Sequence, residues 1–230
     1  MVEIKRRLSW VDFLTPLSEA QLDDLLLRRA DFVRLRGGEE LVLGPEEQAE
    51  RMVLLVAGQL QVYVMSPSER ELTLSVLSGG SAVASTGLVP RWARELHIRA
   101  LEASVVCRIK REELEGLVRT NPEVGLRLAR MLAARVLLME DRWADMAEKE
   151  VSERLAGLLY MLVESEGVMT KEGPMIPTHY THQQLGSMIG ANREAVTRAF
   201  AALQEGGCVE QKKRRVYVRD YDALLEMAAE

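Results

Sequence analysis

The stretch from Thr181 to Leu203 constrains the fold of this 230-residue chain more than any other. Thr181 and Gln184 form a capping box, the side-chain pattern that starts a helix. Gly190 permits a sharp turn, and Asn192 is a favourable N-cap for a second helix. Two short helices joined by a glycine turn predict a helix-turn-helix.

The second helix of this motif has one apolar and one polar face. Val196, Phe200 and Leu203 share the apolar face, which we expect to be buried. The second helix of a helix-turn-helix lies in the major groove of DNA, with its N-terminal side chains at the base edges. The residues of the motif that we expect at DNA are Thr181, His182, Gln183, Asn192, Arg193, Glu194, Thr197 and Arg198.

A basic hairpin is predicted directly after the motif. Gly206 and Gly207 end the helix, and residues 208–211 and 216–218 are expected to form two strands. The tip between these strands consists of Lys212, Lys213, Arg214 and Arg215. We expect the tip to contact DNA phosphates, as the wing of a winged helix does.

Positive charge is concentrated in this part of the chain. Residues 181–219 contain seven lysines and arginines and three glutamates, a net charge of 7 − 3 = +4, whereas the whole chain carries −5. The alternative to a DNA-binding region is a helical hairpin inside a bundle, with arginines that are merely solvated. Local positive charge on an acidic chain favours DNA binding over that alternative.

The composition limits the classes of protein to which the chain can belong. Hydrophobic residues make up 47% of the sequence, enough for the cores of two domains. The two cysteines, Cys107 and Cys208, exclude a disulfide framework and a four-cysteine cluster site, and we expect Cys107 to be buried rather than reactive. No apolar run reaches the length of a membrane span. We therefore expect a cytoplasmic protein with no cofactor, no bound metal and no membrane contact.

The first half of the chain predicts a small helical region followed by a β-rich domain. Residues 9–30 look helical, with a capping box at Ser18 and Gln21. From Asp31 to Ile109 short segments alternate with a period of two, and turn residues separate them. Many short strands at this spacing predict a sandwich or barrel, whose interior can hold one small ligand or only side chains.

The longest helical stretch begins at Asn121 and Pro122 and continues to Met146 without an internal proline. A single long helix between two domains has little of its own protein to cover its apolar stripe, so we expect it to pair with its twin in a parallel homodimer. The alternative is that the stripe packs entirely on the β-rich domain. The residues that we expect at the dimer seam are Leu128, Met131, Leu132, Arg135, Leu138, Met139, Arg142 and Met146.

Two segments of the second half resemble the family of the cyclic-AMP receptor protein and the fumarate-nitrate regulator, the CRP/FNR family. Asn192–Arg198 is similar to the family's S/T-R-E-T-V-S/G-R. Val151–Leu159, at the start of another predicted amphipathic helix, is similar to V-x-x-R-L-A-x-x-L. A polar loop is expected between them, from Glu166 to Thr178. The order of a β-rich domain, a long helix and a winged helix also matches the family.

The resemblance implies an α+β fold in three parts. These are an N-terminal double-stranded β-helix, a jelly roll of the cyclic-nucleotide-binding type, in residues 1–117, a long dimerisation helix in 118–149, and a C-terminal winged helix-turn-helix in 150–230. The implied function is not enzymatic: a homodimeric transcription regulator binds a palindromic promoter site in double-stranded DNA. Activation through RNA polymerase is the commoner role in the family, and repression by blocking a promoter is the alternative. Arg193, Glu194 and Arg198 would read the bases, since an arginine can donate to guanine and a glutamate can accept from cytosine.

The region that holds the ligand in cyclic-nucleotide members of the family is altered here. Those members bind the ribose with a glutamate and the phosphate with an arginine followed by serine or threonine. The matching residues in this chain are Ala84, Arg94 and Glu95. A carboxylate at Glu95 repels a phosphate and competes for Arg94, so we expect regulation without cyclic AMP. The alternatives are a roll that binds another small ligand and a metal enzyme, which would need more ligands in the roll than His97.

Overall fold

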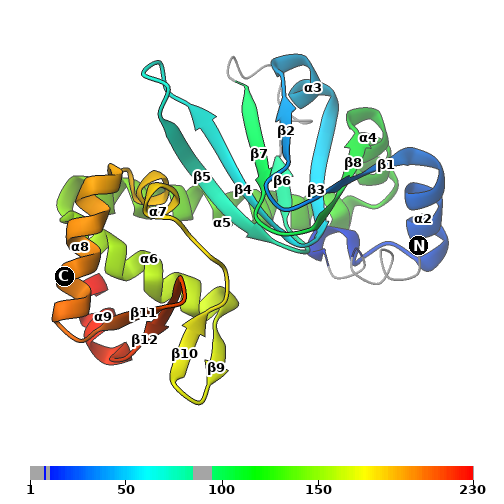
Figure 1. The fold of residues 1–230 in the computed structure, drawn as a ribbon. Helices are drawn as coiled ribbons and strands as arrows, with labels where there is room; N and C mark the ends of the chain where they lie inside the picture. Colours follow the sequence, from blue (N-terminus) through cyan, green and yellow to red (C-terminus); the bar gives the residue numbers. More distant parts are fainter. Residues whose placement is uncertain (1–7, 9–10, 85–94, 230) are drawn as a thin grey trace. The chain divides into compact units, whose positions relative to one another are not determined.

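The computed structural model describes residue 8, residues 11–84 and residues 95–229 of the chain (Figure 1). The chain divides into two compact units, Met1–Leu138 and Met139–Glu230. The boundary falls inside the longest helix, α5 (Pro122–Glu148). The first unit contains the β-rich domain that the sequence predicts, and the second contains the helix-turn-helix.

The described part of the first unit is built from two four-stranded antiparallel sheets, with the strand orders β1-β8-β3-β6 and β2-β7-β4-β5. The strands are β1 (Ala30–Leu35), β2 (Glu40–Leu43), β3 (Arg51–Ala57), β4 (Gln59–Met65), β5 (Glu71–Ser78), β6 (Ala82–Ala84), β7 (Leu96–Ala100) and β8 (Ser104–Lys110). The helical segments are a 3₁₀ turn at Asp12–Leu14, α2 (Glu19–Asp24), a π turn at Leu25–Arg29, α3 (Pro45–Glu50), α4 (Arg111–Thr120) and the first part of α5.

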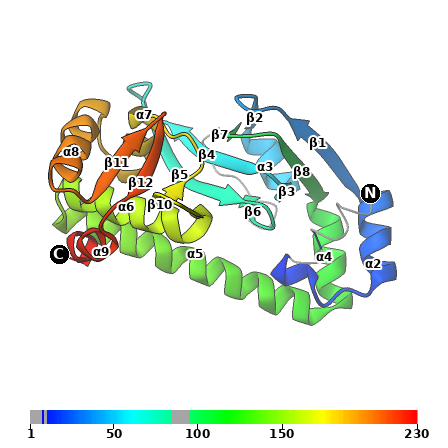
Figure 2. The ribbon, with the colours of Figure 1, turned by 60° about the horizontal axis from the view of Figure 1, so that its bottom comes forward.

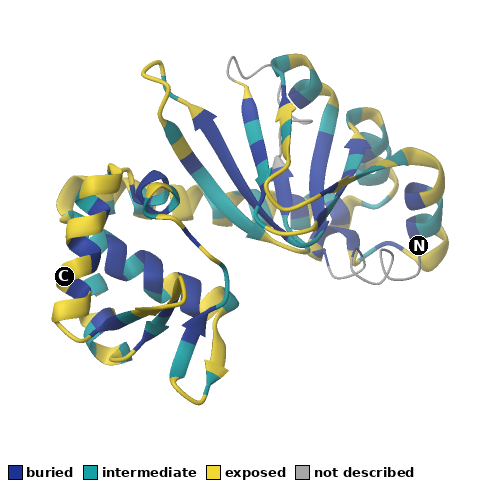
Figure 3. Cartoon of the chain, in the orientation of Figure 1, coloured by how far each residue is buried: buried dark blue, intermediate teal, exposed yellow. Residues whose placement is uncertain are grey.

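Alternation along the strands gives this β-roll two cores. On β3, Val53 and Leu55 are buried among apolar side chains of both sheets, so this cluster fills the interior of the roll. Met52 and Leu54 lie on the opposite face of the same strand and pack with the helical segments of the unit. Figure 2 shows α2, α4 and the first part of α5 at one end of the roll, and β3 is dark blue along much of its length in Figure 3. Successive side chains of β3 point alternately into the two cores, so both faces of the strand are buried and its sequence is almost continuously apolar.

The N-terminal region is less helical than the sequence predicts for residues 9–30. Ser18 and Gln21 do form the predicted capping box, with the Gln21 backbone N–H donating to the Ser18 hydroxyl at 3.3 Å. The α-helix that follows has only six residues and ends in the π turn. Strand β1 already begins at Ala30, which pairs with Ile109 of β8. This sheet pairing, which the local pattern does not contain, ends the helical region.

The first part of α5 packs in the core of its own unit. Leu128 is only 3% exposed and lies among side chains of the N-terminal segments and α4. Met131 and Leu132 are half-buried against the same core. These residues were expected at a dimer seam, but here they follow the alternative packing, because the chain's own roll unit covers them. Leu128 has almost no surface left for a partner.

Arg135 also turns toward the roll. Its guanidinium donates to the backbone carbonyl oxygens of Ala82 and Val83 on β6, each at 3.4 Å, and to the Ser75 hydroxyl at 3.4 Å. These hydrogen bonds connect α5 to β6 and β5 inside the first unit.

The second unit is built around α6 (Val151–Glu166), against which α7, α8, α9 and β10 pack (Figure 1). Its four-stranded sheet has the order β11-β12-β10-β9. The remaining elements are β9 (Val168–Thr170), β10 (Gly173–Ile176), α7 (His182–Ile189), α8 (Arg193–Glu205), β11 (Val209–Lys212), β12 (Arg215–Val218) and α9 (Tyr221–Ala229).

Two elements of this unit depart from the sequence prediction. Residues 166–178, predicted to be a polar loop, contain the hairpin β9–β10, whose Ile176 pairs with Val216 and so extends the sheet of the wing. Helix α9 was not predicted. It starts where the Asp220 carboxylate accepts the Ala223 N–H at 2.9 Å, and its Leu224 is fully buried. The N-cap at Asp220 is a signal from which α9 could have been predicted.

Candidate nucleic-acid interface

The helix-turn-helix forms where the sequence predicts it, because local signals fix both helices. The Gln184 backbone N–H donates to the Thr181 hydroxyl at 3.1 Å, and the Thr181 N–H donates to the Gln184 side chain at 2.8 Å. Gly190 ends α7 in the left-handed conformation, with φ of 68°. The Asn192 side chain accepts the Ala195 N–H at 2.7 Å and starts α8.

The two helices approach each other closely at Gly186. A Cβ atom at this position would lie 2.6 Å from the Ala191 carbonyl oxygen and 3.3 Å from Val196 Cγ2. Glycine therefore permits the close contact that sets α8 against α7.

The polar face of α8 is open to solvent. Its apolar side chains are buried in the unit, whereas Arg193, Glu194 and Arg198 are exposed. Figure 3 shows both buried and exposed stretches along α8. Within the described part of the chain, these three side chains take part in no hydrogen bond or ion pair. Their donor and acceptor atoms therefore have no partner in the described part of the chain and are available to base edges.

The hydroxyl of Thr197, one of the residues expected at DNA, bridges α7 and α8. It donates to the Arg193 carbonyl oxygen at 2.8 Å, and its oxygen lies 2.9 Å from His182 Nδ1. The His182 ring also contacts the Phe200 ring, with 5.3 Å between their centroids. Burial, and then the positive charge of Arg193, lower the pKa of His182. Gln183 remains exposed at the start of α7.

The wing is the hairpin β11–β12 with its two-residue tip. Lys212 pairs with Arg215 across the hairpin, and Lys213 and Arg214 between them have φ of 49° and 67°. Two consecutive residues with positive φ are characteristic of the tight turns that suit the twist of a hairpin. Both tip side chains are exposed, and neither has a polar partner among the described residues. Lys213 and Arg214 are therefore available to phosphates.

The two basic residues that flank the tip have partners within the protein. Lys212 Nζ lies 2.8 Å from Glu172 Oε2 and 3.2 Å from Glu210 Oε1. Arg215 Nη1 lies 3.9 Å from Met175 Sδ on the neighbouring strand β10. Sequence reasoning missed Glu172, because it belongs to the segment that was expected to be a loop.

Comparison with known proteins decides the family of this chain. The family model for the Crp-like helix-turn-helix domain matches residues 153–227, and that for the cyclic nucleotide-binding domain matches residues 32–121. The cAMP-activated global transcriptional regulator CRP of Salmonella typhimurium is 26% identical over 173 residues, which are 75% of this chain and 82% of that protein. The chain belongs to the CRP/FNR family of DNA-binding transcription regulators.

One further relative and two solved structures are similar to this chain over most of its length. The global nitrogen regulator of Synechocystis is 26% identical over 79% of this chain and 82% of that protein. The structure of FixK2 from Bradyrhizobium japonicum matches 87% of this chain and 98% of its own, with a TM-score of 0.73 and 22% identity. A CRP-family regulator from Thermus thermophilus matches 86% of this chain and 97% of its own, with a TM-score of 0.72 and 23% identity. The expected α+β fold of roll, long helix and helix-turn-helix is confirmed.

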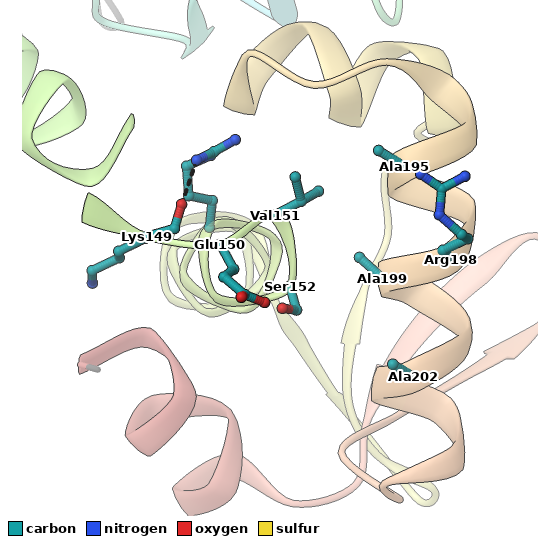
Figure 4. A pocket seen from close by; sticks show the side chains of 9 residues that line it. Lys149, Glu150, Val151, Ser152, Ala195, Arg198, Ala199 and Ala202 are labelled. Carbon is teal, nitrogen blue, oxygen red and sulfur yellow. Dashed lines mark hydrogen bonds between the residues drawn. The ribbon is translucent and has the colours of Figure 1, made fainter. Parts of the chain in front are cut away.

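An open pocket of about 500 Å³ adjoins the recognition helix of this CRP/FNR chain (Figure 4). The residues on one side come from the first turn of α6 and the two residues before it, and include Ser152 and Lys149. Those on the other side come from α8 and include Ala195 and Arg198. Sequence reasoning singled out neither Lys149 nor Ser152, since only the folded unit places them next to α8. Lys149 Nζ lies 3.4 Å from Asp145 Oδ1 and is therefore partly neutralised.

The structure describes the altered ligand region of the roll only in part. Ala84 ends β6, but Arg94 lies outside the described residues, and with it the expected ion pair between Arg94 and Glu95. Glu95 Oε2 lies 4.0 Å from His97 Nε2, and the His97 ring stacks on Tyr63 with 5.0 Å between centroids. His97 thus packs within the sheet of β4 and β7.

Three further observations concern other kinds of site. Cys107 is fully buried, and its burial raises the pKa of the thiol to about 12, so it is not reactive in the folded unit. In the part of the chain that the structure describes, no three side chains of the metal-binding types come together as a group that could hold an ion. No helix there has both the length and the apolar character to cross a membrane.

Proposed function

We propose that this CRP/FNR chain acts as a homodimer in the cytoplasm and reads a palindromic promoter site through two copies of α8. The exposed and unpaired side chains of Arg193, Glu194 and Arg198 carry this proposal, because they can reach base edges without first losing a partner in the protein. Lys213 and Arg214 at the wing tip would add phosphate contacts that fix the orientation on DNA. Activation through contact with RNA polymerase belongs to the same proposal.

A dimer is supported by the apolar side chains that α5 leaves exposed. Val136 is 52% exposed and Trp143 is 73% exposed, large fractions for such side chains. They belong to a stripe with alternating spacings of three and four residues, as in a coiled coil. This stripe consists of Leu126, Ala129, Ala133, Val136 and Trp143, and Glu140 interrupts it near its end. Of the seam expected from sequence, Leu138, Met139 and Met146 are exposed as well and stay in the proposal, together with Arg142.

The dimer proposal is tested by placing a charge in the exposed stripe. Val136→Glu should convert the dimer to a monomer, because a carboxylate buried at a coiled-coil seam lacks a partner. Leu27→Glu is the matched control, since Leu27 is 66% exposed on the π turn and lies outside α5. Analytical ultracentrifugation measures the mass in solution. A wild-type protein that is monomeric at micromolar concentration, or a Val136→Glu variant that stays dimeric, would contradict this seam.

We further propose that DNA binding does not need cyclic AMP. Glu95 stands where the nucleotide-binding members carry a hydroxyl for the phosphate. The hydrogen bonds of Arg135 to β6 and Ser75 connect α5 to the roll through the protein's own polar groups. Activation by cAMP is part of the name of the Salmonella relative, and on this proposal the present chain differs from it.

The test of the whole proposal is a titration of purified protein with palindromic DNA selected from a random pool. We expect tight, specific binding whose affinity is the same with and without cyclic AMP. Binding that appears only with the nucleotide would refute effector independence and leave the DNA-reading role intact. Failure to select any sequence would refute the DNA-reading role itself.

A further inference from the structure

Four basic residues of the wing region fall into two groups. Lys213 and Arg214 at the tip have no polar partner in the described part of the chain. Lys212 and Arg219, by contrast, both form ion pairs with the carboxylates of Glu172 and Glu210. We name these four residues, Lys212, Arg219, Glu172 and Glu210, the wing network.

The distances show that the wing network is continuous. Lys212 Nζ contacts Glu172 and Glu210 at 2.8 and 3.2 Å. Arg219 donates from Nη2 to Glu210 Oε2 at 2.6 Å and from Nε to the same oxygen at 2.8 Å, and its Nη2 lies 3.4 Å from Glu172 Oε2. Each carboxylate therefore serves both cations. The pKa values shift accordingly: Lys212 lowers that of Glu172, and Arg219 lowers that of Glu210.

The position of the acids matters for DNA binding. Glu172 lies in the turn between β9 and β10, and Glu210 lies on β11, so both approach the wing from its own sheet. The four side chains are between 30% and 53% exposed, and ion pairs this open to solvent contribute little to folding stability. Their larger effect is on the charge that the wing offers to an approaching phosphate.

We infer that Glu172 and Glu210 limit the affinity of the wing for DNA, by competing with phosphates for Lys212 and Arg219. This inference rests on the proposed function, because it assumes that the wing meets the DNA backbone. Phosphate contacts do not depend on sequence, so the competition should weaken binding to selected and random DNA by the same factor. A regulator surrounded by a large excess of random sites benefits from a limit on its general affinity for DNA.

The test is the variant Glu172→Gln, which removes one charge from the wing network and keeps the shape of the side chain. Arg219 also donates from Nη1 to the Glu172 backbone carbonyl oxygen, and this contact does not depend on the carboxylate. Glu226→Gln is the matched control, since it makes the same charge change at an exposed position on α9, outside the wing network. Glu210→Gln is a second, independent variant of the wing network.

Binding to selected and to random duplexes is measured between about 50 and 200 mM salt. Glu172→Gln should raise both affinities about threefold to tenfold over those of Glu226→Gln at low salt. The slope of log K against log salt should steepen by up to about 0.9 for each side chain, Lys212 or Arg219, that becomes free to contact a phosphate. If the role of Glu172 were only structural, Glu172→Gln would change the thermal stability of the protein but not the slope of log K against log salt.

The outcomes separate the inference from the proposed function. Variants Glu172→Gln and Glu210→Gln that match Glu226→Gln at every salt concentration would overturn the inference. Weaker DNA binding in both variants would overturn it too, since the carboxylates would then support the wing rather than compete with phosphates. In either case the proposed function stands as long as the wild-type protein still prefers selected over random DNA.

Discussion

The recognition helix α8 and the wing both present basic side chains to solvent, but they differ in what these side chains already contact. On α8, Arg193 and Arg198 have no polar partner in the described part of the chain. On the wing sheet, Lys212 and Arg219 are held by carboxylates. The arginines that would read bases are thus free of internal partners, whereas part of the positive charge of the hairpin that would bind phosphates is neutralised by carboxylates. The positive charge that a DNA-binding surface offers to DNA depends on which of its basic side chains already form ion pairs within the protein.

This difference corrects the charge count from the sequence. The value of +4 for residues 181–219 treats every lysine and arginine as available. Glu172 lies outside that window and reaches Lys212 only because the β9–β10 hairpin joins the sheet of the wing. The positive charge available to DNA is therefore smaller than the sequence indicates, and it is centred on the tip and on α8.

The largest effect is expected on α8. Arg198→Ala should lower the affinity for the selected site by about 1–3 kcal/mol, roughly 5-fold to 150-fold, and relax preference at one base pair. Arg193→Ala should do the same at another position. Arg28→Ala is a control with the same charge change, because Arg28 is exposed in the first unit. Competition binding with single-base variants of the site measures both quantities. A loss that is equal for every sequence would assign these arginines to phosphates.

A smaller and sequence-independent effect is expected at the wing tip. The double variant Lys213→Gln, Arg214→Gln should weaken selected and random DNA by the same factor, since neither side chain is expected to reach a base. The slope of log K against log salt should become shallower by about 0.9 for each lost contact, hence by about 1.8. The slope is obtained from titrations over a range of salt concentrations. A change in the preferred sequence would show that the tip reads bases, and the contrast between α8 and the wing would fail.

The helix-turn-helix could be predicted from the sequence because its signals are local. Thr181 with Gln184, Gly190 and Asn192 each fix one backbone feature within a few residues, and all of them act in the structure as predicted. The hairpin of the wing is another local prediction, because its strands pair with their nearest neighbour. Its tip has two residues rather than the four expected, since Lys212 and Arg215 belong to the strands. The exposed face of α8 follows from helical periodicity alone.

The features that sequence reasoning missed depend on contacts between distant segments. The period along α5 predicts an apolar stripe but does not say what covers it, and the core of the first unit covers Leu128. The hairpin β9–β10 is too short to stand out, and Pro174 argues against a strand, until the pairing of β10 with β12 is known. Thr197 looks like a base reader on a helical wheel, yet its hydroxyl is engaged by Arg193 and His182. Which polar atoms remain available is decided by tertiary structure.

The smallest effect concerns His182, which connects α7 to α8 beside the recognition arginines. The Thr197 hydroxyl has one proton and donates it to the Arg193 carbonyl oxygen, so its oxygen must accept from His182 Nδ1–H. In the neutral ring this leaves Nε2 without a proton. Burial and the charge of Arg193 oppose a second proton, which is why the folded protein holds the pKa of His182 below the ordinary 6.5.

The sign of the pH dependence follows from this lowered pKa. As the pH falls below about 6.5, the unfolded chain takes up a proton at His182 that the folded unit resists. The stabilising contribution is therefore complete above that pH and is lost as the pH falls through the folded pKa. Chemical unfolding at several pH values should show a flatter profile for His182→Gln than for wild type. His179→Gln is the control, because His179 is exposed ahead of α7. An NMR titration that places the pKa of His182 at or above 6.5 would contradict this prediction, because the α7–α8 contact would then leave the ring open to water.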